Sequence, residues 1–190
     1  MPVVDFFYDV VSPYSYLAAT QVARIEAKAE VHWRPFWLAG VMQATGNQPP
    51  FLVPARAQYM QRDLQRLAAF YGVQLVMPAT FPFETLTAMR CLLTLPAALL
   101  PASSLALFEA VWVEGRDVAD RQVLKDLFGA EVLDQAAASA GKLALKENSD
   151  EAVMRGAFGA PSFFLGDELY FGCDRLFLLE HDLAAARGAS

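Results

Sequence analysis

The feature that most limits how this chain can fold is a short turn between an apolar run and the start of a helix. Val3–Val11 has the length and composition of a buried strand. Ser12 follows as a helix N-cap with Pro13 at the first helical position, so a helix is predicted over Tyr14–Ala29. Glu30–Phe36 alternates as a second strand. This β-α-β order predicts a parallel strand pair joined by a right-handed crossover.

The middle of the chain is predicted to be mainly helical. The segment 46–50, with its Gly, Asn and two Pro residues, is a loop by composition. An extended stretch is expected at Val73–Met77. Helices are expected at Ala55–Tyr71, Thr85–Leu95, Ser103–Val113, Asp120–Phe128 and Val132–Ala140, with a further short one at Ser149–Arg155.

The last part of the chain returns to strands. Ser162–Leu165 and Glu168–Phe171 are separated by a Gly-Asp pair and predict a hairpin, followed by a helix at about Leu176–Ala186. The element order therefore predicts the α/β class, with a thioredoxin-like fold (β-α-β … β-β-α) that carries a large helical insertion. Residues 1–36 and 156–190 are expected to form the thioredoxin-like domain, and residues 37–155 the inserted, mainly helical domain.

The composition limits the partners and the setting of the chain. Of its 190 residues, 55% are hydrophobic, which is enough to bury a core. The formal net charge of −6 disfavours nucleic acid and anionic membrane surfaces, and no apolar stretch is long enough to cross a bilayer. The start of the chain lacks the pattern of a secretory signal, so a cytoplasmic location is expected.

Cysteine and histidine are too rare in this chain to indicate metal chemistry. Two histidines do not make a metal site or a convincing catalytic triad, so no metal is expected. Cys91 and Cys173 form no CxxC motif. A reducing setting is favoured, although one long-range disulfide stays open.

The residues at the first turn indicate where chemistry takes place. On its own, Ser12-Pro13 is most simply a helix cap. In thioredoxin-like proteins, however, this strand-to-helix turn carries the reactive CxxC, and here the four residues are Ser12, Pro13, Tyr14 and Ser15. Dithiol exchange through this motif is therefore impossible. A hydroxyl remains, which suits the thiolate of a bound ligand.

Two later segments complete a candidate site for glutathione. Pro161 precedes a strand, and in this fold the corresponding proline is cis and faces the first turn, with the backbone of Ala160 free to pair with a peptide ligand. The Gly172–Arg175 segment lies at a helix start, where Asp174 is either a cap or the partner of an ammonium group. Together with Ser12, these parts are what a site for glutathione needs.

Several segments give the chain a resemblance to a known family along nearly its whole length. They are FFYDVVSPYSYLA, ATGNQPP with VPARAQYMQRDL, PATFPFETLTAMR, VWVEGRDVAD and DEAVMRGAFGAPSFFLGDELYFGCDRL. The chain resembles the 2-hydroxychromene-2-carboxylate isomerases, which are related to kappa-class glutathione transferases and have a DsbA-like thioredoxin fold. The resemblance implies a glutathione-dependent isomerase that opens an aromatic hemiketal by reversible thiolate addition.

The resemblance also implies roles for particular residues. The serine that matches Ser12 hydrogen-bonds the glutathione sulfur and is catalytic. The positions that line the glutathione site match Asn47, Pro54, Ala160, Cys173 and Asp174. The implied partners are glutathione and a small aromatic substrate, and the implied assembly is a homodimer.

The chain departs from the family in ways that bear on its second substrate. Gln43 stands where family isomerases commonly have a lysine that suits a substrate carboxylate, and Glu84 stands where they often have asparagine. Cys173, often Gln or Ser in relatives, is expected to be a structural thiol. Two alternatives stay open: a kappa-type transferase or peroxidase that acts on other electrophiles, and a redox-inert thioredoxin-fold module that binds a peptide.

Overall fold

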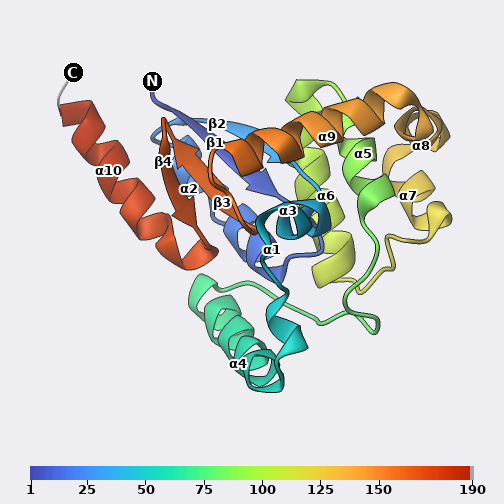
Figure 1. The fold of residues 1–190 in the computed structure, drawn as a ribbon, viewed down its shortest axis with the longest axis horizontal. Coiled ribbons are helices and arrows are strands. Elements are labelled where there is room, and N and C mark those ends of the chain that lie inside the picture. Colours follow the sequence, from blue (N-terminus) through green and yellow to red (C-terminus); the bar gives the residue numbers. More distant parts are fainter. Residues whose placement is uncertain (189–190) are drawn as a thin grey trace.

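The computed structural model describes residues 1–188 and contains, in that range, a four-stranded mixed sheet between layers of helices (Figure 1). The strand order is β2-β1-β3-β4, with β1 at Val3–Tyr8, β2 at Glu30–Pro35, β3 at Ser162–Leu165 and β4 at Glu168–Phe171. β1 is parallel to β2 and antiparallel to β3, and β3 is antiparallel to β4. The predicted α/β class, the first strand pair and the hairpin are confirmed.

Helices and short 3₁₀ turns make up the rest of the described structure. The α-helices are α1 (Pro13–Ala19), α2 (Val22–Glu26), α3 (Leu38–Thr45), α4 (Pro54–Tyr71), α5 (Leu86–Thr94), α6 (Leu100–Trp112), α7 (Arg121–Phe128), α8 (Ala130–Ala137), α9 (Ser139–Met154) and α10 (Leu176–Gly188). The 3₁₀ turns are η1 (Pro50–Leu52), η2 (Ala97–Leu99) and η3 (Cys173–Arg175). Within residues 1–188, no helix combines the length and the apolar composition that crossing a membrane requires.

All regular elements between β2 and β3 are helices or 3₁₀ turns, as expected for the insertion. In Figure 1, α4 projects as a lower lobe, α5, α7 and α8 lie on the side away from α10, and α9 runs across the sheet. The domain boundaries at residues 36 and 156 remain a prediction, and residues 189 and 190 of the outer domain lie outside the described part of the chain.

The two faces of the sheet bury two separate apolar clusters. Side chains alternate along β1, so Phe6 and Phe7 point to opposite faces. Phe6 stacks on Phe163 with ring centroids 4.5 Å apart, inside the larger cluster that includes residues of α1, α2, α5, α6 and α10. Phe7 packs against Phe164 in the smaller cluster, to which α3 and α9 contribute. This packing fixes the end of β1, where the candidate site begins.

The first strand and the first helix are both shorter than predicted. β1 ends at Tyr8 because Asp9 turns the chain: its carboxylate accepts the Val11 N–H at 3.1 Å, and its carbonyl accepts the Ser12 N–H at 3.0 Å. The helix expected over Tyr14–Ala29 is divided into α1 and α2. At the break, the Thr20 hydroxyl donates to the Leu17 carbonyl at 2.7 Å. Threonine side chains that bond to the nearby backbone in this way compete with the backbone hydrogen bonds of a helix.

Two helices of the insertion were missed or shortened in the prediction. α3 was not predicted, because its sequence LAGVMQAT holds a glycine and no charged residue. A Cβ at Gly40 would lie 2.5 Å from the Trp37 ring, so close packing requires glycine there. α9 extends over Ser139–Met154, whereas only Ser149–Arg155 was expected. Its helix-forming Ala, Leu, Lys and Glu residues outweigh a weak apolar pattern.

Candidate functional site

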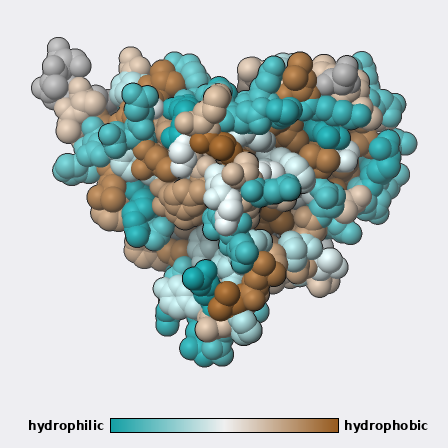
Figure 2. All heavy atoms as spheres, viewed as in Figure 1, coloured by the Kyte–Doolittle hydropathy of each residue, from teal (hydrophilic) through white to brown (hydrophobic). Residues whose placement is uncertain are grey.

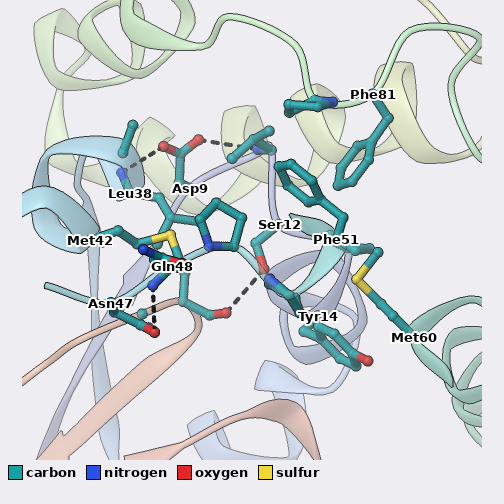
Figure 3. A pocket seen from close by; sticks show the side chains of 18 of the residues that line it. Asp9, Ser12, Tyr14, Leu38, Met42, Asn47, Gln48, Phe51, Met60 and Phe81 are labelled. Atoms are coloured by element: carbon teal, nitrogen blue, oxygen red, sulfur yellow. Dashed lines mark hydrogen bonds between the residues drawn. The ribbon is translucent and has the colours of Figure 1, made fainter. Parts of the chain in front are cut away.

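Ser12 stands at the start of α1 and uses its hydroxyl in two hydrogen bonds. The Ser12 backbone is extended, and its Oγ accepts the Ser15 N–H at 3.1 Å, as the N-cap assignment predicts. The same Oγ donates to the carbonyl of Ala160 at 3.0 Å (Figure 3). Ser12 is thus tied to a segment 148 residues later in the sequence. Its only hydroxyl proton is already taken by that carbonyl.

The segment before β3 faces Ser12 through a cis peptide bond between Ala160 and Pro161. The backbone of Ala160 was expected to be free for a ligand; its carbonyl accepts the Ser12 hydroxyl, which occupies one of its two lone pairs, and pairing with a ligand remains a prediction. The Ala160 N–H has no acceptor within residues 1–188. Asn47 supports the segment from the side, since its Nδ2 donates to the Phe158 carbonyl at 2.8 Å.

The turn that begins at Gly172 carries the predicted ammonium partner. Gly172 has a φ of 95°, and a Cβ there would lie 2.6 Å from Asp174 Oδ1, so the turn requires glycine. The half-exposed Asp174 carboxylate pairs with Arg175 Nη1 at 2.5 Å. Burial raises the pKa of the Cys173 thiol to about 12, which favours the structural role expected for it. Cys91 and Cys173 are both free and buried, so they form no disulfide.

A cavity of about 1020 Å³ brings these segments together. The residues singled out in the sequence that line it are Ser12, Gln43, Asn47, Glu84, Ala160, Gly172 and Asp174. Four others are sequence neighbours of lining residues without lining the cavity themselves: Pro54, Pro161, Cys173 and Arg175. The structure thus gathers most of the candidate site around Ser12, while the role of each residue remains a prediction.

Apolar side chains that the sequence reasoning did not assign to the site form much of the cavity wall. They are Trp37, Leu38, Met42, Phe51, Met60, Phe81 and Phe83. In Figure 3, Phe51, Phe81 and Met60 lie on one side of Ser12, and Met42 and Asn47 lie on the other. Figure 2 shows hydrophobic side chains at the junction between α4 and the rest of the molecule. The aromatic spacing in FPF at residues 81–83 was the available signal.

Asp9 was also missed, although it lies at the inner end of the cavity lining. Its side chain is fully buried. Burial raises its pKa to about 6, and the nearby charge of Glu84 acts in the same direction. Hydrogen bonds from Leu38, Val11 and Thr85 lower the pKa and partly offset the burial. An aspartate inside the apolar run Val3–Val11, close to Ser12 in the sequence, was the signal that could have identified it.

The charged groups around the cavity are mostly acidic. The lining contains the carboxylates of Asp9, Asp63, Glu84 and Asp174, and its one cation among the described residues is Arg56. Glu84 Oε1 accepts the Thr85 and Leu86 N–H groups at 2.9 and 2.7 Å, so the carboxylate caps the start of α5. The cavity therefore offers little attraction for a second substrate that carries a negative charge.

Asp63 anchors a tyrosine of the Ser12 turn to α4. Its carboxylate accepts the Tyr14 hydroxyl at 3.1 Å and lies 3.5 Å from the hydroxyl of Tyr59. Burial, followed by the charge of Asp63, raises the pKa of Tyr14 well above its usual range. Tyr14 therefore remains a neutral hydrogen-bond donor and not a base.

Comparison with known proteins relates this architecture to a family. A family model described as a DSBA-like thioredoxin domain matches residues 3–184. The chain is 32% identical over 189 residues to the 2-hydroxychromene-2-carboxylate isomerase of Pseudomonas putida, covering 94% of this chain and 92% of that protein. It is 31% identical over 204 aligned positions to glutathione S-transferase kappa 1 of Rattus norvegicus, covering 94% and 89% of the two chains.

Solved structures give the same result. A structure of a selenomethionine 2-hydroxychromene-2-carboxylate isomerase matches with a TM-score of 0.86 at 29% identity, covering 97% of this chain and 95% of that one. The cytosolic disulfide reductase DsbM of Pseudomonas aeruginosa, solved with GSH, shares the fold with a TM-score of 0.69 at 21% identity and 98% coverage of both chains. The chain therefore belongs to the DsbA-like thioredoxin family, among relatives named 2-hydroxychromene-2-carboxylate isomerases and kappa-class glutathione S-transferases.

Proposed function

We propose that this protein is a glutathione-dependent isomerase of the 2-hydroxychromene-2-carboxylate type, acting on an intermediate of aromatic degradation. One observation carries the proposal: the Ser12 hydroxyl lies at the polar end of a large cavity whose other walls are mainly apolar and aromatic. Such a cavity suits a polar thiol compound together with a planar aromatic substrate. A relative at 32% identity that is named as this isomerase supports the reaction class.

The polar end of the cavity fits glutathione. The Ala160 N–H, which has no acceptor within residues 1–188, suits pairing with the backbone of a tripeptide. Asp174 suits the γ-glutamyl ammonium group. Arg56 is exposed and has no acidic partner in the described part of the chain, so it suits a carboxylate of the same ligand.

Ser12 has the task of keeping the ligand sulfur ionised. When bound, glutathione would supply a nucleophilic thiolate that adds reversibly to the conjugated substrate and permits rotation about a former double bond. The Ser12 hydroxyl proton now bonds to the Ala160 carbonyl. To stabilise a thiolate, the hydroxyl must turn from that carbonyl towards the sulfur. A backbone N–H of the ligand would then replace it at Ala160, so no buried acceptor loses its partner.

The apolar walls are proposed to hold the second substrate. Phe51, Phe81 and Met42 offer ring faces, ring edges and a thioether for a planar aromatic compound. Gln43 and Glu84 line the same cavity and are proposed to contact the polar groups of that compound. The family resemblance also underlies the proposals of a homodimer and a cytoplasmic location, which sedimentation and cell fractionation test.

The test is an isomerisation assay combined with titration of the bound thiol. Turnover of 2-hydroxychromene-2-carboxylate should require added glutathione. Ser12→Ala should raise the pKa of the bound thiol by about one to two pH units, since a hydrogen bond to a charged group contributes about 1.5–3 kcal/mol. Thiolate absorbance against pH measures this.

Ser15→Ala is the matched control for this titration. It removes a hydroxyl from the same turn, and Ser15 does not line the cavity. The control should leave the thiol titration unchanged. Equal titrations for wild type and Ser12→Ala would remove Ser12 from the chemistry.

A kappa-type transferase or peroxidase is the second candidate. The observation in its favour is the acidic lining with Gln43 in place of the usual lysine, because a neutral electrophile avoids repulsion from Glu84. Faster turnover of a neutral aromatic halide or an organic hydroperoxide than of the chromene carboxylate would select it. Absence of glutathione binding would instead leave the peptide-binding module as the remaining hypothesis.

A further inference from the structure

The Asp9 carboxylate joins three segments that are far apart in the sequence. Its Oδ1 accepts the Val11 N–H at 3.1 Å, and its Oδ2 accepts the Leu38 N–H at 2.9 Å and the Thr85 hydroxyl at 3.2 Å. Figure 3 shows the bond to Leu38 beside Ser12. All three donors point at one fully buried side chain. Asp9 is therefore the point at which these segments are held together.

Each of these segments forms a different wall of the cavity. Val11 lies in the turn that presents Ser12. Leu38 begins α3, the helix that carries Met42 and Gln43. Thr85 lies directly before α5 and follows the 81–84 segment of the lining. A change at Asp9 therefore affects both the end of the cavity that contains Ser12 and the end lined by aromatic residues.

An ionised carboxylate suits this position because it only accepts hydrogen bonds, and all of its partners donate. Protonation would remove the charge that strengthens these three hydrogen bonds and would place a hydrogen on a buried carboxyl group whose partners are all donors. The titratable groups that face Asp9 are Glu84, from the segment before α5, and Tyr8, its neighbour on β1. Residues 10–13 and α3 contribute no ionisable side chain.

We propose that Asp9 is a positioning residue: its ionised carboxylate holds the Ser12 turn, α3 and the start of α5 in the arrangement that binds ligands, and its protonation weakens the three bonds and loosens that arrangement while the protein stays folded. The ligand affinity of the cavity would then decrease as the pH falls. The test of this proposal by ligand binding rests on the proposed function, because glutathione is the expected ligand.

Calorimetry with S-methylglutathione tests the proposal, since this ligand has no thiol to titrate. The wild-type affinity should fall as the pH is lowered, with a midpoint near 6, in line with the raised pKa of Asp9. In Asp9→Asn the affinity at pH 8 should be weaker by about fivefold and nearly constant down to about pH 5. Histidine is the residue type that ordinarily titrates in this range, and neither His32 nor His181 lines the cavity.

Asp63→Asn is the matched control, because it removes another cavity carboxylate without touching the three bonds at Asp9. It should retain the fall in affinity near pH 6. Thr85→Val removes one donor and should shift the midpoint upward, since the Thr85 hydrogen bond lowers the pKa of Asp9. An Asp9→Asn profile that still falls like the wild type would overturn the proposal.

NMR of the free protein separates this proposal from the proposed function. The amide protons of Val11 and Leu38 should titrate together with a midpoint near 6 in the wild type and stay constant in Asp9→Asn. If the wild type fails to bind S-methylglutathione at any pH, the proposed function fails while the amide titration still decides the role of Asp9. Constant amide shifts in the wild type would reject that role directly.

Discussion

Two buried serines show how much a single hydroxyl contributes at the scale of the residue. Within the described part of the chain, Ser15 Oγ is buried without a hydrogen-bond partner, whereas Ser104 Oγ bonds to the Leu100 carbonyl at 2.6 Å and to the Tyr8 hydroxyl at 2.5 Å. An unsatisfied buried hydroxyl costs about 1–3 kcal/mol. Ser15→Ala should therefore stabilise the protein by about 1 kcal/mol, and Ser104→Ala should destabilise it by a similar amount or more. Urea denaturation measures both, and a loss of stability in Ser15→Ala would show that its hydroxyl has a partner in solution.

Asp174 is the residue on which recognition of the glutathione amino end is proposed to depend. Its carboxylate is about half exposed and already pairs with Arg175. Screening by solvent and the charge of Arg175 therefore weaken its attraction for the ammonium group of a ligand. Asp174→Ala should weaken glutathione binding by about 1 kcal/mol, or roughly fivefold. Arg175→Ala removes the competing cation and should leave binding unchanged or tighten it. Calorimetry that finds equal affinity for wild type and Asp174→Ala would leave Asp174 a turn residue only.

At the scale of elements, local signals predicted the parts of the site that lie at turns. The Ser12 cap, the strand pair and the β3–β4 hairpin follow from short-range turn chemistry, which the sequence displays directly. α3 could not be predicted in this way, because it is stabilised by contacts with Trp37 and by the Asp9 carboxylate at its first N–H. The apolar walls arise from segments around Phe51 and Phe81 that only the tertiary fold brings together.

The start of α5 determines how strongly Glu84 acts on a substrate. Its carboxylate accepts two N–H groups there, which absorb part of its charge, while Gln43 on α3 has no charge to offer. Gln43→Lys with Glu84→Asn should raise kcat/KM for the chromene carboxylate by about fivefold, and Gln43→Lys alone should give most of that gain.

Gln48→Lys is the control for this pair, because it adds a charge elsewhere on the cavity lining. Steady-state kinetics decide between the alternatives. An equal gain from Gln48→Lys would mean that overall charge matters, and no gain from any variant would mean that Gln43 and Glu84 do not select the substrate.

At the scale of the whole molecule, the cavity is built at a cost to stability. Asp9 organises three walls from one buried, charged side chain without a cation beside it in the described part of the chain. Burying such a charge opposes folding, although its hydrogen bonds offset part of the cost. Functional sites often retain groups of this kind, because an uncharged core would be more stable but would not hold the same geometry.

The dependence of stability on pH should reveal that cost. The pKa of Asp9 rises from the ordinary 3.8 to about 6 on folding, so the folded state binds the proton more tightly than the unfolded state. The contribution of Asp9 to the free energy of unfolding should therefore decrease as the pH rises from about 4 to about 7, by about 3 kcal/mol in all. Asp9→Asn lacks this titration. Any change that the buried amide makes to the free energy of unfolding does not depend on pH, so it does not alter how the difference between variant and wild type varies with pH. Urea denaturation should show Asp9→Asn gaining on the wild type with rising pH, and a difference that stays constant between about pH 4 and about pH 7 would mean that Asp9 is not buried as a charge.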